Sequence, residues 1–310
     1  MTCKMRNIWI FGATGFIGSA LVRHLAKSPA NRLHLLIHKH QPFLNYESFN
    51  TITGSIENVD PFWFERYPPD VVFHLARPAG SNSFRRFVAA RRGEKANRRI
   101  VKLFSALVQP PVIVYVSGSL VYGSQRLSFA KEDTELSPVS YAKYYFSNEK
   151  PLLKARSEGR LDVRFARPGW VTGPGSWFRE FFWKYYLAEG KIPCYGDGSQ
   201  KMSLIHLDDC AAMIDLVSQD ATAGKDLNIF AGKPLLHLEF CEMLASLLNT
   251  GVDFISPKAV KRKFGSDTAE ALLSSIPLDT SYPDIHKKAD IIYMEHKKLL
   301  ADVIRLLKHE

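Results

Sequence analysis

The chain has 310 residues, of which 46% are hydrophobic and 23% charged, proportions typical of a soluble globular protein with a sizeable core. No apolar run is long enough to span a membrane and an apolar strand begins by residue 8, so we expect a cytoplasmic protein without membrane anchor or signal peptide. The net charge of +10 leaves an anionic partner open, and four widely spaced cysteines predict reduced thiols without a metal site or disulfide framework: Cys3, Cys194, Cys210 and Cys241.

The first predicted strand, Ile8–Phe11, runs directly into a glycine-rich turn, and the amphipathic stretch Ser19–Lys27 follows as a helix. Glycines at intervals of three let the backbone turn tightly, approach a ligand closely and pack the helix against the strand. Amides at the start of such a helix point at a bound pyrophosphate. The strand before and the helix after distinguish this turn from an ordinary connection, so it predicts a dinucleotide site. The residues predicted to face the cofactor are Gly12, Thr14, Gly15, Phe16, Ile17 and Gly18.

The end of the second predicted strand, Leu33–Ile37, indicates which dinucleotide binds. NAD sites place an acidic residue there for the ribose hydroxyls, whereas NADP sites place basic residues for the 2′-phosphate. His38 and Lys39 follow this strand, and no acid accompanies them. We therefore expect NADP(H) as the cofactor, with NAD as the alternative.

The long predicted helix Ser83–Gln109 carries most of the excess positive charge. Between Phe84 and Lys102 it has a single acid, Glu94, and eight cations: Arg85, Arg86, Arg91, Arg92, Lys95, Arg98, Arg99 and Lys102. We interpret the stripe as a solvated helix face. The aromatic residues on which single-stranded nucleic acid would stack are not interleaved through it, so nucleic acid is disfavoured as a partner.

Strands alternate with helices over the first half of the chain, which predicts an α/β fold with a Rossmann-type doubly wound parallel sheet. The further strands expected are Asn50–Thr53, Val71–Leu75, Val112–Val116 and Asp162–Phe165, with a helix at Tyr141–Glu158. The texture then changes to the aromatic-rich stretch Ser176–Ala188 and short mixed elements, before a last helix at about Met294–Lys308. We expect a cofactor domain over residues 1–168 and a smaller C-terminal substrate lobe, interleaved with the last sheet elements, over 169–310.

Several motifs in order resemble the extended short-chain dehydrogenase/reductase family, in its epimerase/dehydratase group: Gly12–Gly18, Asp70–Ala76, Val114–Gly123, Arg167–Val171, Gly173–Gly175, Tyr195–Gln200 and Ile205–Asp209. The resemblance covers nearly the whole chain. It implies further cofactor contacts at Ser55, Ile56, Leu75, Ala76, Arg77, Asn97, Pro168 and Val171. The family's acid after the third strand is Ser55 here, which also favours NADP(H).

The resemblance places the family's general acid–base tyrosine at Tyr141 and its supporting glutamate at Glu149. In the family a lysine follows the tyrosine by four residues, and its charge favours the ionised phenol. Here that position is Tyr145, so the activating charge is missing and Tyr145 becomes a candidate active-site residue itself.

Two more positions depart from the family pattern. The family's catalytic serine or threonine falls on Gly118, which leaves Ser117 and Ser119 as candidate hydroxyls or ordinary turn residues. The arginine that grips the substrate diphosphate is Met202, and a thioether cannot replace a guanidinium on phosphate. The stretch Ser176–Ala188 could form an aromatic wall for a substrate, but we interpret it as core.

Three functions remain open from the residues. One is an NADP(H)-dependent reductase, epimerase or dehydratase of a small carbonyl or sugar-like substrate, with an atypical active site. Another is an inactive NADP(H)-binding sensor or scaffold, and the last is an interaction module that uses the basic helix. Because a two-fold contact of that helix would oppose like charges, we expect a monomer or a homodimer through another surface.

Overall fold

The computed structural model describes residues 5–38, 49–77, 80, 83–125, 128–219 and 222–309, with residue 83 in its backbone only. The chain divides into two compact units. The first comprises Met1–Ser117, Tyr144–Ala166 and Ala211–Leu227, and the second comprises Gly118–Lys143, Arg167–Cys210 and Asn228–Glu310. The chain therefore passes repeatedly from one unit to the other.

A seven-stranded sheet is built around β1, with the order β10-β6-β5-β4-β1-β2-β3. Its pairs β1–β2, β1–β4, β2–β3, β4–β5 and β5–β6 are parallel. The strands are β1 (Arg6–Phe11), β2 (Asn31–Ile37), β3 (Asn50–Thr53), β4 (Val71–His74), β5 (Val112–Val116), β6 (Val163–Pro168) and β10 (Leu227–Ile229). Strand order reverses at β1, as in doubly wound folds, so the predicted fold class is confirmed.

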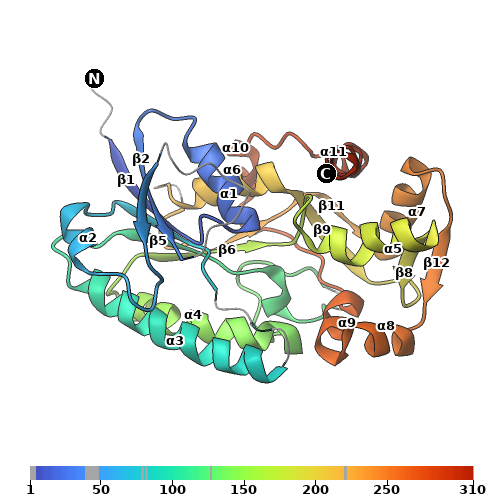
Figure 1. The fold of residues 1–310 in the computed structure, drawn as a ribbon, viewed down its shortest axis with the longest axis horizontal. Helices are drawn as coiled ribbons and strands as arrows, with labels where there is room; N and C mark the ends of the chain where they lie inside the picture. The colour runs from blue at the N-terminus through green and yellow to red at the C-terminus, as the bar shows by residue number, and fades with distance from the viewer. Residues whose placement is uncertain are drawn as a thin grey trace. The chain divides into compact units, whose positions relative to one another are not determined.

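Helices cover both faces of this sheet, which is why its central strands β4 and β5 are almost wholly buried. They are α1 (Phe16–Leu25), α2 (Phe62–Arg66), α3 (Ser83–Ser105), α4 (Ser140–Ser157) and α6 (Leu207–Val217). Figure 1 shows α3 along one face of the sheet and α1 along the other. Under α3 and α2, the side chains of Phe64, Ile100 and Phe104 pack with Trp9 and Phe11 of β1 in one buried cluster.

Element boundaries differ from the sequence-based ranges by a few residues. Helix α1 begins at Phe16, three residues earlier than expected, because the helix starts directly after Gly15. Strand β6 continues to Pro168, and the short helix α2 was not predicted. On α3, six of the eight cations of the basic stripe are exposed and Arg86 and Arg99 are half-buried, as a solvated face requires.

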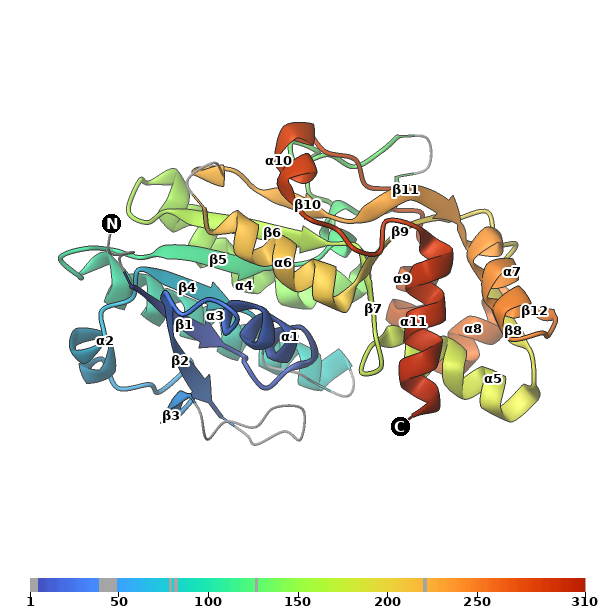
Figure 2. The ribbon, with the colours of Figure 1, turned by 90° about the horizontal axis from the view of Figure 1, so that it is seen from above.

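The second unit contains a three-stranded sheet of order β11-β9-β7 and a parallel pair, β8–β12. Its strands are β7 (Trp170–Thr172), β8 (Ile192–Tyr195), β9 (Lys201–His206), β11 (Ala231–Leu236) and β12 (Val252–Ile255). Its helices are η1 (Ser119–Tyr122), the π-helical η2 (Arg179–Trp183), α5 (Lys184–Glu189), α7 (His237–Leu247), α8 (Pro257–Phe264), α9 (Ser266–Leu273), α10 (Pro283–Lys288) and α11 (His296–Lys308). In Figure 2, α7 lies beside β8 and β12.

The aromatic-rich stretch forms the core of the second unit. Phe178 and Phe182 are fully or almost fully buried, and they pack with Phe240 of α7 and with Leu299 and Val303 of α11. The interpretation of this stretch as core is confirmed. In the part of the chain that the structure describes, no helix combines the length and the apolar character that crossing a membrane requires.

Candidate functional site

The glycine-rich turn has the geometry that the sequence predicts. Gly12 has φ +86°, a left-handed conformation, and a Cβ there would lie 2.8 Å from the backbone nitrogen of Ala76. A Cβ on Gly18 would overlap the Gly12 carbonyl oxygen and lie 2.9 Å from its carbon. The Gly15 amide donates to the Gly12 carbonyl at 3.0 Å, which closes the turn. Only glycine fits at positions 12 and 18, so the start of α1 comes close to the ends of β1 and β4.

The start of α1 fits a bound diphosphate. Gly15 caps the helix with an extended backbone and no side-chain hydrogen bond, which leaves the first amides of α1 open to a ligand. Thr14, Phe16 and Ile17 are half-buried around this turn, while Gly15 itself is exposed. The residues present therefore suit a dinucleotide phosphate, which needs close backbone approach and unpaired amides.

The second region predicted to face the cofactor lies at the carboxyl ends of β2 and β3. His38 follows β2 and is exposed, whereas Lys39 lies outside the described residues. Gly54 donates its amide to the Ile37 carbonyl at 2.9 Å and holds the segment after β3 against β2. In that segment the Ser55 hydroxyl donates to Asn58 Oδ1 at 2.8 Å, and Ile56 is buried.

The segment after β4 brings Leu75, Ala76 and Arg77 to the same edge of the sheet as Gly12. The Leu75 amide donates to the Phe11 carbonyl at 2.8 Å, which ties this segment to the end of β1. Leu75 and Ala76 are half-buried and Arg77 is exposed. Backbone from two neighbouring strands therefore frames the turn, as the family resemblance implies.

Asn97, predicted as a cofactor contact, is buried between β4, α3 and α4. It is 1% exposed, its Oδ1 accepts from His74 Nε2 at 2.8 Å, and its Nδ2 donates to the Asn148 carbonyl at 2.8 Å. Burial lowers the pKa of His74 to about 4, even though the bond to Asn97 raises it, so His74 is a neutral donor. Asn97 thus links β4, α3 and α4, and a Cβ on Gly93 would overlap Asn148, which lets the two helices pack closely.

The two candidate serines follow β5. Ser117 is 3% exposed, and its hydroxyl donates to the carboxylate of Glu149, which is fully buried on α4. Ser119 is also buried, at the start of η1 in the second unit. The Ser117–Glu149 hydrogen bond connects β5 with α4 and gives Ser117 a positioning role inside the first unit.

Tyr141 and Tyr145 lie one turn apart on α4, so their side chains leave the same side of the helix. Tyr141 is 39% exposed and Tyr145 is half-buried. The guanidinium carbon of Arg77 lies 4.6 Å from the centre of the Tyr145 ring, a cation–π contact. A positive charge therefore lies over the side chain that occupies the family's lysine position. The pairing could not be predicted from the sequence, because 68 residues separate Arg77 from Tyr145.

In the second unit, Pro168 and Val171 are buried at the end of β6 and in β7. Met202 is 4% exposed and belongs to the apolar core, so it presents no group to a phosphate. The Nζ of the neighbouring Lys201 lies 5.5 Å from the ring centre of Phe129. The side chains around Met202 enclose a cavity of only about 10 Å³, which includes Trp170 and Trp177 in its lining and has room for about one water molecule.

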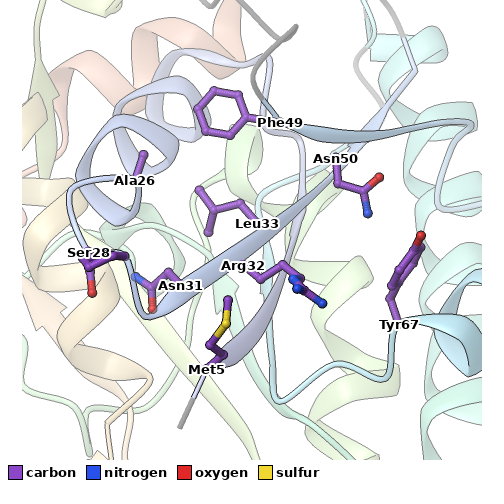
Figure 3. A pocket seen from close by; sticks show the side chains of 10 residues that line it. Met5, Ala26, Ser28, Asn31, Arg32, Leu33, Phe49, Asn50 and Tyr67 are labelled. Atoms are coloured by element: carbon purple, nitrogen blue, oxygen red, sulfur yellow. The ribbon is translucent and has the colours of Figure 1, made fainter. Parts of the chain in front are cut away.

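A separate pocket of about 570 Å³ lies at the amino ends of the strands, opposite to the glycine turn. Figure 3 shows the Arg32 guanidinium and the Asn50 amide on the side of Tyr67, with Leu33 and Phe49 on the other side. Ligands of doubly wound folds bind at the carboxyl ends of the strands. This pocket is therefore not part of the candidate cofactor site.

One cluster in the second unit was missed by the sequence analysis. Cys194, His237 and Cys241 are all buried, and their ligand atoms lie within 4.8 Å of one another. The His-x-x-x-Cys spacing on α7 could have been noticed, but Cys194 is brought in only by the packing of β8 against α7. Within the described part of the chain, these three residues are a group that could hold a metal ion.

A model of the NAD dependent epimerase/dehydratase family matches residues 8–230, more than half of the chain. The chain belongs to this family. Among relatives, it is 28% identical over 166 residues to a dTDP-glucose 4,6-dehydratase of Streptomyces antibioticus, covering 51% of this chain and 50% of the relative. It is 26% identical over 290 residues to the dTDP-glucose 4,6-dehydratase of Salmonella typhimurium, covering 82% and 78%. The chain spans about half the length of the Streptomyces relatives that it matches.

Solved structures of this epimerase/dehydratase family have the same fold. The dTDP-glucose 4,6-dehydratase of Bacillus anthracis in complex with NAD superposes with a TM-score of 0.78 at 19% identity, over 98% of this chain and 97% of that one. The UDP-glucuronic acid 4-epimerase of Bacillus cereus, in complex with UDP-glucuronic acid and NAD, gives 0.78 at 20% identity over 98% and 99%. At such identities the likeness extends to the fold alone.

Proposed function

We propose that this family member binds a dinucleotide, NADP(H) in preference to NAD(H), and works as a reductase, epimerase or dehydratase of a small carbonyl or sugar-like substrate. The observation that carries the proposal is the glycine turn, where a side chain at position 12 or 18 would overlap backbone. In dinucleotide-binding folds the first glycine of such a turn makes the turn tight and the last packs the helix against the strand, which brings the helix start to the pyrophosphate.

The NADP(H) preference rests on the residues after β2 and β3. Lys39 offers an ammonium group and His38 an imidazole, and Ser55 offers no carboxylate to the ribose. The pair of a 2′-phosphate with lysine is a charge-assisted contact, so we expect NADP(H) to bind about 10- to 100-fold tighter than NAD(H). The relatives solved with NAD make this preference the first point to measure.

Calorimetric titration with both cofactors tests the preference. Lys39→Asp should reverse it, while Lys27→Asp, which makes the same charge change beyond the end of α1, should leave it unchanged. Equal or tighter binding of NAD(H) by the unaltered chain would refute the NADP(H) proposal and leave the dinucleotide site itself standing.

For the chemistry, the bound nicotinamide would supply or accept a hydride. Tyr141 would exchange a proton with the substrate oxygen through its phenol, as a general acid or base. We propose that Arg77, held over Tyr145, provides the positive charge near this tyrosine that the family resemblance assigns to a lysine. Glu149 and Ser117 would fix α4 against β5 and so position both tyrosines.

Single-turnover oxidation of bound NADPH by small aldehydes and ketones tests this role. Tyr141→Phe should abolish turnover while cofactor affinity is kept, and Arg77→Gln should slow it by about 100-fold, the usual size of such support. Tyr67→Phe, which removes a phenol at the opposite edge of the sheet, is the matched control and should keep full activity.

A second candidate function is an NADP(H)-binding sensor or scaffold without turnover. Two observations favour it: the Ser117 hydroxyl is already bonded to Glu149, and Met202 is buried where a phosphate-binding arginine is expected. This alternative predicts tight NADPH binding, no hydride transfer to any carbonyl probe, and the same result for Tyr141→Phe as for the unaltered chain.

A further inference from the structure

Three soft or borderline metal-binding side chains meet in the second unit, apart from the candidate cofactor site. Cys194 is on β8, and His237 and Cys241 are four residues apart on α7, so both helix residues face the strand. The Cys241 Sγ and His237 Nε2 atoms are 3.7 Å apart, and all three ligand atoms lie within 4.8 Å of one another.

The surrounding backbone holds these three residues in place. The Leu238 amide donates to the Gly198 carbonyl at 3.0 Å, and Glu239 Oε2 accepts from the Leu236 amide at 2.7 Å, which together fix the start of α7. Gly198 has φ +75°, and a Cβ there would lie 2.9 Å from Cys194 Sγ. Glycine at this position therefore leaves room beside the sulfur.

The spacing of the donor atoms matches a metal centre. Zinc bonds of about 2.3 Å to sulfur and about 2.1 Å to nitrogen give a sulfur–nitrogen separation of about 3.6 Å in a tetrahedron and about 3.8 Å in a trigonal plane. The observed 3.7 Å falls between these values. The Cys241 thiol donates to the Pro193 carbonyl oxygen at 3.4 Å, so an oxygen donor also lies beside this sulfur.

We propose that Cys194, His237 and Cys241 form a structural site for a thiophilic divalent cation, Zn²⁺, in the second unit of this protein. Thiolate and imidazole donors select zinc or copper(I) over magnesium or calcium. Zinc with two thiolates and a neutral imidazole has no net charge, whereas copper(I) in the same site is left with one negative charge in an apolar core. Burial therefore favours zinc.

Binding releases the two thiol protons to solvent and forms two zinc–sulfur bonds and one zinc–nitrogen bond, with no change of oxidation state. At present the Nε2 atom of His237 accepts the Tyr195 amide at 3.1 Å. Zinc coordination replaces this hydrogen bond, so the Tyr195 amide is a reporter of metal binding that is independent of cofactor and substrate.

The test starts from the full chain, purified without an affinity tag and refolded with Zn²⁺ or with a chelator. We expect about one zinc per chain by elemental analysis and, with Co²⁺ in its place, thiolate-to-cobalt charge-transfer absorption. Cys194→Ser and Cys241→Ser should each lower zinc affinity at least 100-fold. Cys210→Ser, which changes another buried free cysteine of the same unit outside the cluster, should keep the full affinity.

If the serine variants do not fold, stepwise mercurial titration of the unaltered chain gives the answer, because zinc should be released in step with two thiols. Four results would overturn the proposal: no zinc after refolding in Zn²⁺, equal zinc loss in Cys210→Ser, a Cys194–Cys241 disulfide in the purified chain, or preferential occupancy by copper. None of these readouts depends on NADP(H) binding or turnover.

Discussion

Replacing Gly18 by alanine should loosen α1 from the end of β1 and weaken dinucleotide binding. The new Cβ would overlap the Gly12 carbonyl oxygen and lie 2.9 Å from its carbon and 3.1 Å from the Cα of Ala13. These neighbours are backbone atoms of a tight turn, so no side-chain rotation relieves the contact. The start of α1 has to move by about 1 Å to restore ordinary separations.

Overpacking of this kind costs about 1–3 kcal/mol, and the better helix propensity of alanine returns up to about 1 kcal/mol. We therefore expect the free energy of unfolding to fall by about 2 kcal/mol. With an unfolding entropy of about 0.65 kcal/mol/K for a chain of this length, the melting temperature should fall by about 3 °C. NADPH affinity should drop more than about tenfold, because the helix amides move with the helix start.

Thermal unfolding and NADPH titration of Gly18→Ala and Gly251→Ala form the assay. A Cβ at position 251 meets no atom within 4 Å, so this control should keep both its melting temperature and its NADPH affinity. Gly15→Ala, whose Cβ would lie 3.3 Å from the Gly12 oxygen, should fall between the two in stability. If Gly18→Ala matches Gly251→Ala in both measurements, the close-approach argument is wrong.

Other expected outcomes follow from burial and charge. Burial lowers the pKa of His74 from 6.5 to about 4, so the unfolded chain takes up a proton at this residue before the folded chain does as the pH falls below 6.5. About 2 kcal/mol of the folding free energy present at pH 7 should therefore be lost at pH 5. The denaturant midpoint of His74→Gln should decline less over this pH range than that of the unaltered chain. Turnover of UDP-, GDP- or dTDP-sugars should be about 100- to 10,000-fold below that of the family's enzymes, because Tyr145, Gly118 and Met202 replace the family's lysine, hydroxyl residue and arginine. Robust epimerase or dehydratase activity in a chromatographic assay would contradict this prediction. Light scattering should find a monomer, or a dimer that the double variant Arg91→Glu, Arg98→Glu leaves intact. The reason is that these exposed cations oppose a two-fold contact of α3. A dimer that the double variant disrupts would show that α3 forms the interface.

The sequence by itself determined the architecture of the first unit and the place of its glycine-rich turn. The strands Asn50–Thr53 and Val112–Val116 were both predicted to the residue. Val112–Val116 is a continuous apolar run of a central strand, whereas Asn50–Thr53 is an edge strand with one buried residue, and turn residues bound both. The need for glycine at positions 12 and 18 was equally predictable, because the turn that they form is local in the sequence. Features that depend on neighbouring residues can therefore be predicted from the sequence.

Long-range pairings were decided only by the tertiary structure. The sequence left Ser117 open between catalysis and turn formation, and the packing of β5 against α4 directs its hydroxyl to Glu149. The sequence also shows a neutral tyrosine, Tyr145, at the family's lysine position, whereas the fold brings the guanidinium of Arg77 onto the ring of this tyrosine. A spacing rule along one helix cannot predict a cation that another segment of the chain, here the one after β4, brings to that helix.

The cysteines show a second case in which the sequence did not predict residues that meet in the fold. Their wide spacing in the sequence predicted no site, yet β8 and α7 bring Cys194, His237 and Cys241 within 4.8 Å of one another. Distance along the chain says little about distance in space once a strand and a helix pack on one core. The sequence thus determined most elements of the first unit and its glycine-rich turn, and the packing of those elements decided which side chains meet.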